Sequence, residues 1–105
     1  MALVYVPHKP GNTHEYDSAA SFGKITVVLE GAVSTHNHGM VEKMLKAGLS
    51  DFKPDDYLML SGSRFILAVS LAIVLGRHGK VNVLQHSSRT NTYDMYVLDL
   101  GLGKG

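Results

Sequence analysis

The stretch from Phe65 to Leu75 constrains the fold more than any other part of this sequence. It reads FILAVSLAIVL, and Ser70 is its one polar residue. It falls well short of the ~20 residues that a membrane span requires, but its length suits a buried helix. A helix that is apolar all round must be buried on more than one side. The neighbours of this helix therefore decide the architecture.

Two interpretations explain how such a helix is covered. One sheet covers roughly one stripe of it, and a chain of 105 residues has little other material to offer. We therefore expect a homo-oligomer, most simply a two-fold dimer with these helices near the interface. The alternative is that an N-terminal arm, residues 7–23, folds over the exposed side. The interface candidates are Phe65, Val69, Ala72 and Ile73.

Further periodic segments surround this helix and predict the fold class. Some are short apolar or alternating runs typical of strands, and one carries apolar residues three and four apart, as an amphipathic helix does. The expected strands are 25–30, 57–60, 81–85 and 93–100, the first helix spans 41–52 and is stopped by Pro54, and the second spans 64–77. Strand-helix-strand connections give parallel neighbours. The prediction is an α/β fold: a small parallel sheet (a β-α-β-α-β core) with a C-terminal antiparallel hairpin strand and two helices.

The N-terminal part is less regular. Ala2 to Val6 is a short apolar run ended by Pro7, which we interpret as a first strand. Residues 8–23 have no sustained period beyond one helical turn near 18–22. We divide the chain into an N-terminal strand and arm at 1–23, a single α/β domain at 24–100 and a flexible tail at 101–105.

Composition narrows the function classes. Ten Lys and Arg against nine Asp and Glu give a net charge of +1, with no clustered basic patch, so a nucleic-acid partner is not expected. The absence of cysteine excludes disulfides, thiolate nucleophiles and Cys-based zinc sites and fits a reducing compartment. The N-terminus lacks a signal-peptide pattern. We expect a cytoplasmic protein that needs no membrane and no cofactor.

Two loops of the predicted sheet, at 31–39 and at 61–64, lie on the same edge and could each hold an anion. Ligands of an open parallel sheet bind at the carboxyl ends of the strands, where Ser61, Gly62, Ser63 and Arg64 lead into the second helix. Free N–H groups at the helix start and the guanidinium fork would suit an anion. The structural interpretation is that Ser63 is an N-cap and Gly62 a turn residue, because the full phosphate-binding fingerprints are absent.

His36 and His38 are the one close histidine pair, in the loop at 31–39. If the protein were an enzyme, one of them would act as a general acid or base, because imidazole titrates near neutral pH. No third ligand converges on them, so no metal site is predicted. A solvent-exposed or capping role is the alternative. No set of catalytic residues can be assembled, and the balance is against an enzyme.

The sequence resembles a family of small proteins encoded by tailed bacteriophages. The resemblance lies in DFKPDDYLMLSGS at 51–63, the apolar helix, GKVNVL at 79–84 and a hairpin ending in VLDL at 97–100. This chain has Gln85-His86 where the family often has Trp-Asp. The resemblance implies a phage origin, hence a host-cytoplasmic location, and no particular chemistry.

A looser likeness is to the CRISPR-associated Csx3-like ring nucleases. It rests on topology and on Ser61-Gly62, where that family has a Ser-Gly pair, although the histidines that family carries in the next helix are missing here.

Two hypotheses for the function follow from these observations. The first is a non-enzymatic, homo-oligomeric phage accessory protein that binds a host or phage protein. The second is a nucleotide-binding or phosphodiester-cleaving protein with an anion site at the strand ends.

Overall fold

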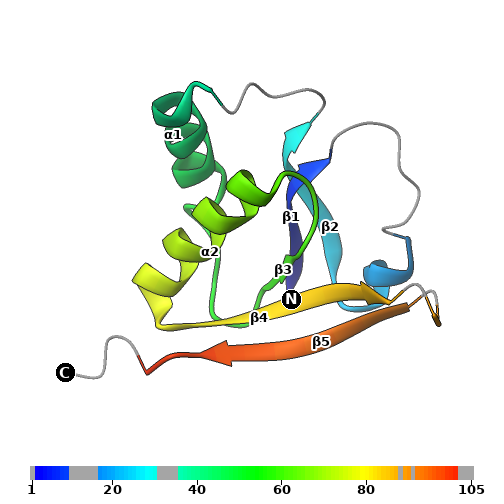
Figure 1. The fold of residues 1–105 in the computed structure, drawn as a ribbon. Coiled ribbons are helices and arrows are strands. Elements are labelled where there is room, and N and C mark those ends of the chain that lie inside the picture. Colours follow the sequence, from blue (N-terminus) through cyan, green and yellow to red (C-terminus); the bar gives the residue numbers. More distant parts are fainter. Residues whose placement is uncertain (1, 10–16, 31–35, 88, 91, 102–105) are drawn as a thin grey trace.

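The computed structural model describes residues 2–9, 17–30, 36–87, 89–90 and 92–101. They form one five-stranded sheet with strand order β2-β1-β3-β4-β5 (Figure 1). The strands are β1 (Leu3–Lys9), β2 (Lys24–Glu30), β3 (Tyr57–Met59), β4 (Lys80–Ser87) and β5 (Thr92–Asp99). The first four run parallel, and β5 pairs antiparallel with β4. The predicted α/β fold class is therefore confirmed.

The N-terminal strand lies inside the sheet, between β2 and β3. We expected Pro7 to end this strand, and that expectation is wrong: β1 continues through a buried Pro7 to Lys9. The pairing of β1 with β3 covers only Val4 and Tyr5. Pro7 lies beyond that pairing, so its missing N–H interrupts no bond of the β1–β3 ladder.

The two helices cover one face of the sheet, and a short 3₁₀ helix covers part of the other (Figure 1). They are α1 (His38–Gly48), α2 (Arg64–His78) and η1 (Asp17–Ser21). Alternate residues of β1 point to opposite faces: Tyr5 packs in the cluster with α2, and Val4 and Val6 pack with Ala19 of η1. The core therefore has two layers of apolar side chains, one on each side of the sheet.

The first helix is shorter than predicted. It ends at Gly48, well before Pro54, and Leu49 is its C-cap. Leu49 and Phe52 are buried as the pattern required, but they lie in turns closed by the bonds from Ser50 N to Ala47 O and from Phe52 N to Leu49 O. Tight turns can thus bury apolar residues at a spacing that imitates a longer helix.

The second helix ends where predicted, at Gly79 with φ of 76° and an N–H bond to the Leu75 carbonyl. Its buried hydroxyl, Ser70, donates to the Ile66 carbonyl at 2.8 Å, which satisfies the one polar group of the apolar stretch. Arg77 donates to the carbonyls of Leu49 and Ser50. The Arg77 side chain, in the last turn of α2, therefore ties this helix to the turn that follows α1. Among the described residues, no helix is long and apolar enough to cross a membrane.

Candidate functional site

The loop between β3 and α2 packs against His8 at the end of β1. The Ser61 hydroxyl donates to the His8 carbonyl at 3.3 Å, and the Ser63 amide donates to His8 Nδ1 at 3.1 Å. His8 itself is buried. An imidazole nitrogen that accepts a hydrogen bond carries no proton, so the neutral ring has its hydrogen on Nε2. Two of the polar groups that we considered for anion binding are thus engaged within the chain.

Gly62 has a specific reason to be glycine. Its φ is +86°, and a Cβ built there would lie 2.5 Å from His8 Cβ and 2.7 Å from the His8 carbonyl oxygen. Both the backbone conformation and the contact exclude a side chain. Gly62 therefore allows the loop before α2 to approach the backbone of β1 closely.

The remaining site candidates lie on the surface nearby. Arg64, His36 and His38 are exposed, and Ser63 caps α2 without a side-chain hydrogen bond. The His38 ring packs on the Phe65 ring, with centroids 4.9 Å apart, so the first turns of α1 and α2 lie side by side. No group of three potential metal ligands occurs within the described part of the chain. Residues 31–35 of the first loop lie outside the described residues.

The outer face of α2 is apolar and open. Along it, Ala68, Ala72 and Gly76 are exposed at intervals of one turn. Of the predicted interface residues, Ala72 is therefore exposed, whereas Phe65, Val69 and Ile73 are half-buried against α1. The described residues leave this stretch incompletely enclosed.

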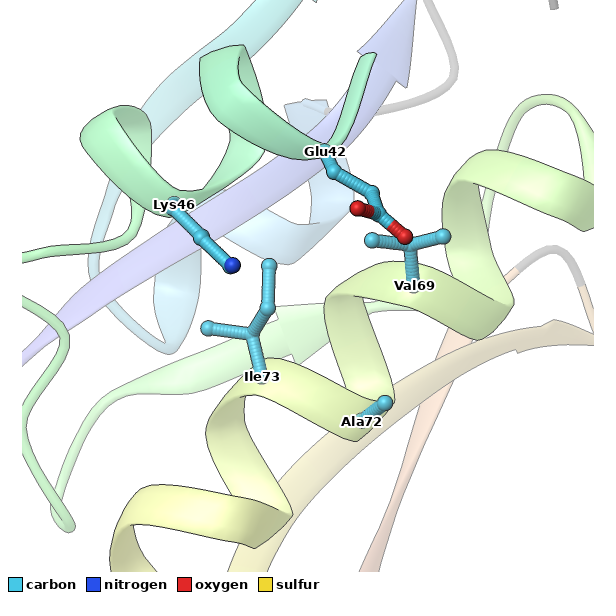
Figure 2. Close-up of a pocket in the computed structure, with 5 residues that line it drawn as sticks. All are labelled: Glu42, Lys46, Val69, Ala72 and Ile73. Atoms are coloured by element: carbon cyan, nitrogen blue, oxygen red, sulfur yellow. The ribbon is translucent and has the colours of Figure 1, made fainter. Parts of the chain in front are cut away.

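A shallow groove lies between the two helices, next to this face. It has a volume of about 320 Å³ and is lined by Glu42 and Lys46 of α1 and by Val69, Ala72 and Ile73 of α2. Figure 2 shows the two charged side chains reaching from α1 toward the α2 side chains. The groove therefore has an apolar floor with one acid and one base on its rim.

A second hollow, of about 330 Å³, lies near the start of β1 and includes Tyr5 and Asp56. The buried Asp56 carboxylate accepts from the amides of Leu3 and Lys53, each at 2.9 Å. Burial raises the pKa of Tyr5, and the carboxylates of Asp56 and Asp51 raise it further. These bonds join β1 to the turn before β3, so Asp56 has a structural role.

Sequence reasoning missed His8 and Asp56. His8 meets residues 53 and 55 positions away, and Asp56 meets Leu3 at a separation of 53. Polar residues in a strand and a turn give no local signal of such partners. The one hint was Gly62, because a glycine in the turn between a strand and a helix often marks close backbone approach.

Comparison with known proteins gives one match. No curated protein and no solved structure matches the chain, and the likeness to Csx3-like ring nucleases gains no support. The family described as "Phage Pam3 gp32-like protein" matches residues 2–100. Because that match covers nearly the whole sequence, the predicted phage relationship is confirmed, and the chain belongs to the Phage Pam3 gp32-like protein family.

Proposed function

We propose that this phage-family protein is a non-enzymatic accessory protein that acts through protein–protein contacts as a homo-oligomer. The observation that carries the proposal is the outer face of α2, where Ala68, Ala72 and Gly76 are exposed within an apolar helix. Small residues let a second helix approach closely, and close approach maximises dispersion contacts. The alternative is that the arm at 7–23 covers α2. The structure describes residues 7–9 and 17–23 of this arm, and η1 packs on the face of the sheet opposite to α2.

The charges around the groove favour a second copy as the occupant. Glu42 and Lys46 lie one helical turn apart on α1, at the rim beside Ala72. A two-fold interface brings a surface against itself. An axis passing between these two residues would set Glu42 of each protomer against Lys46 of the other. The rim is therefore electrostatically complementary to its own copy.

The hydrogen bonds of the loop before α2 and the net charge of the chain disfavour the nucleotide-binding alternative. The Ser61 hydroxyl and the Ser63 amide, which were to hold the anion, already bond to His8. Near-neutral charge, +1 for the chain, also gives no electrostatic attraction for polyanions. The oligomer is instead suited to contact a further host or phage protein, in the host cytoplasm.

Light scattering after size-exclusion chromatography tests the α2 interface. We expect Ala72→Arg to reduce the number of chains per particle two-fold, because a charged, long side chain at a packed interface cannot be accommodated. Ala47→Arg is the matched control, since Ala47 is exposed on α1 and does not line the groove. An unchanged mass for Ala72→Arg, or equal losses for both variants, would overturn the proposal.

A charge exchange tests the predicted rim pairs. Glu42→Lys and Lys46→Glu should each weaken association roughly two- to five-fold, in line with exposed ion pairs of ~0.5–1 kcal/mol. The double exchange should restore the original affinity, because it re-creates opposite charges across the axis. Additive losses in the double variant, measured by sedimentation equilibrium, would contradict the pairing.

A further inference from the structure

A second open apolar surface lies on β5, which the proposed α2 interface does not use. Of the seven exposed large hydrophobic side chains in the described chain, five are in or directly after β5, with exposed fractions between 37% and 59%. They are Met95, Tyr96, Val97, Leu98 and Leu100. Because 95–98 are consecutive and strand residues alternate in direction, both faces of the strand carry apolar groups.

This strand is also an edge of the sheet. Among the described strands its one neighbour is β4, and Figure 1 shows it at the margin of the molecule. Protected edges usually carry lysine, proline or a bulge, but β5 has neither residue, and its register with β4 is continuous over eight pairs. The opposite edge, β2, begins with Lys24, ends with Glu30 and has no exposed large hydrophobic residue.

The direction of the free peptide groups follows from two hydrogen bonds. The Leu84 carbonyl accepts from Leu60 at 2.9 Å, so the peptide groups of Leu84 point toward β3. Its cross-strand partner Met95 is therefore in a pair that exchanges no hydrogen bonds, and its N–H and C=O point away from β4. Leu100 is an even-numbered residue, unlike Met95, and its N–H donates to the carbonyl of Gly79, which directly precedes β4. Even-numbered residues of β5 therefore direct their peptide groups toward β4. Alternation then makes Met95, Val97 and Asp99 present their peptide groups at the open edge.

We infer that β5 pairs with β5 of a second copy, antiparallel, about a two-fold axis at Tyr96. The two five-stranded sheets then join into one sheet across the axis. A two-fold axis normal to the sheet keeps each face of the sheet on the same side in both copies. Each odd-numbered residue of β5 therefore pairs with an odd-numbered residue of the other copy, and each even-numbered residue with an even-numbered one. Met95 meets Val97 of the partner subunit, and Tyr96 meets its own copy. The outward peptide groups bond to each other, and Tyr96 forms a pair without hydrogen bonds.

The charges on β5 are compatible with this self-pairing. Its two acids, Asp94 and Asp99, differ in parity and therefore lie on opposite faces. In this register Asp94 stands four residues from its own copy, about 14 Å along the strand. That exceeds the ~10 Å screening length at 0.1 M salt. Shifting the axis to Met95 would bring the two Asp94 residues to about 7 Å apart along the strand, inside the screening length, and shifting it to Val97 would shorten the pairing. Tyr96 is therefore the favoured centre.

Site-directed cross-linking tests the register, because the chain has no cysteine of its own. Residues in a pair without hydrogen bonds have Cα atoms ~4.5 Å apart, within the span of a disulfide. Tyr96→Cys should therefore form a covalent dimer in a glutathione redox buffer. Asp94→Cys, on the same face of the same strand, should remain at least ten-fold less cross-linked. Equal yields for the two variants, or none for Tyr96→Cys, would overturn the inference.

Light scattering separates this inference from the α2 proposal. With both interfaces the wild-type protein forms an assembly larger than a dimer, because two different two-fold contacts on one chain generate a tetramer or an open polymer. Ala72→Arg and Val97→Lys should each give dimers, and the double variant a monomer. A wild-type dimer that only Ala72→Arg dissociates would overturn the β5 pairing and leave the α2 interface intact. A dimer that only Val97→Lys dissociates would do the reverse.

Discussion

β1 and β5 are strands of similar length and apolar character, yet they have opposite surroundings. β1 lies between two parallel neighbours, and its residues Val4 to His8 are all buried. β5 has β4 on one side, and Tyr93 is its one buried residue. Both segments form strands, and their positions in the sheet decide how much of each is covered.

The difference separates what holds the fold from what remains for a partner. β1 also receives polar contacts, from the Asp56 carboxylate at its start and from the Ser61–Ser63 loop at His8. Substitutions in β1 should therefore affect the free energy of unfolding of a single chain. Substitutions in β5 should instead affect association. The following predictions test this contrast, from the largest expected effect to the smallest.

The same substitution placed in each strand should give the clearest contrast. Val6→Lys puts an ammonium group at a fully buried position and should lower the free energy of unfolding by ~4 kcal/mol or more. Val97→Lys changes an exposed position and should alter it by less than about 0.5 kcal/mol. Urea denaturation followed by circular dichroism, at a concentration where the chain is monomeric, measures both. Similar losses for the two variants would contradict the contrast.

Two glycines with positive φ provide a second comparison. Gly62, at +86°, would place a Cβ against His8, whereas Gly101, at +70° and two residues after β5, has open space. Gly62→Ala should cost ~3 kcal/mol, because strain and overlap add, and Gly101→Ala about 1 kcal/mol from the backbone conformation alone. The two denaturation midpoints measure the difference. If Gly101→Ala cost as much as Gly62→Ala, the contact with β1 would have no energetic weight.

The smallest effect concerns alkaline pH. Burial and the nearby carboxylates raise the pKa of Tyr5 in β1 above its ordinary value of 10.0. The unfolded chain therefore loses this proton first, so the stabilisation is complete below about pH 10 and is lost as the pH rises through the folded-state pKa. Tyr5→Phe should make the decline in unfolding free energy above pH 10 shallower, by at most about 1.4 kcal/mol per pH unit. The control is the same pair of proteins at pH 7, where the phenol is protonated in both states. Parallel declines would contradict the prediction.

Much of the candidate site was not predictable from sequence. The Ser61–Arg64 loop was located correctly as the entry to α2, since Gly and Ser after an apolar run mark such a turn. Its partner, His8, was not foreseen, because β1 is placed beside β3 only by the crossover through β2 and α1. The strand at 93–100 was predicted as the antiparallel hairpin strand, but the exposure of its apolar run at 95–98 was not, since the sequence pattern does not show which faces of a strand are covered.

The sequence by itself determined the order of the strands and the two α-helices, because hydrophobic period and glycine positions are local properties of the chain. The segments at 51–63, 79–84 and 97–100 indicated the phage-family relationship. Only the tertiary structure decided which apolar residues are covered. Val4 and Val97 have the same side chain, and one is buried while the other is more than half exposed. That outcome depends on strand order and on how the two helices pack on the sheet, and these are settled by contacts between residues far apart in the chain.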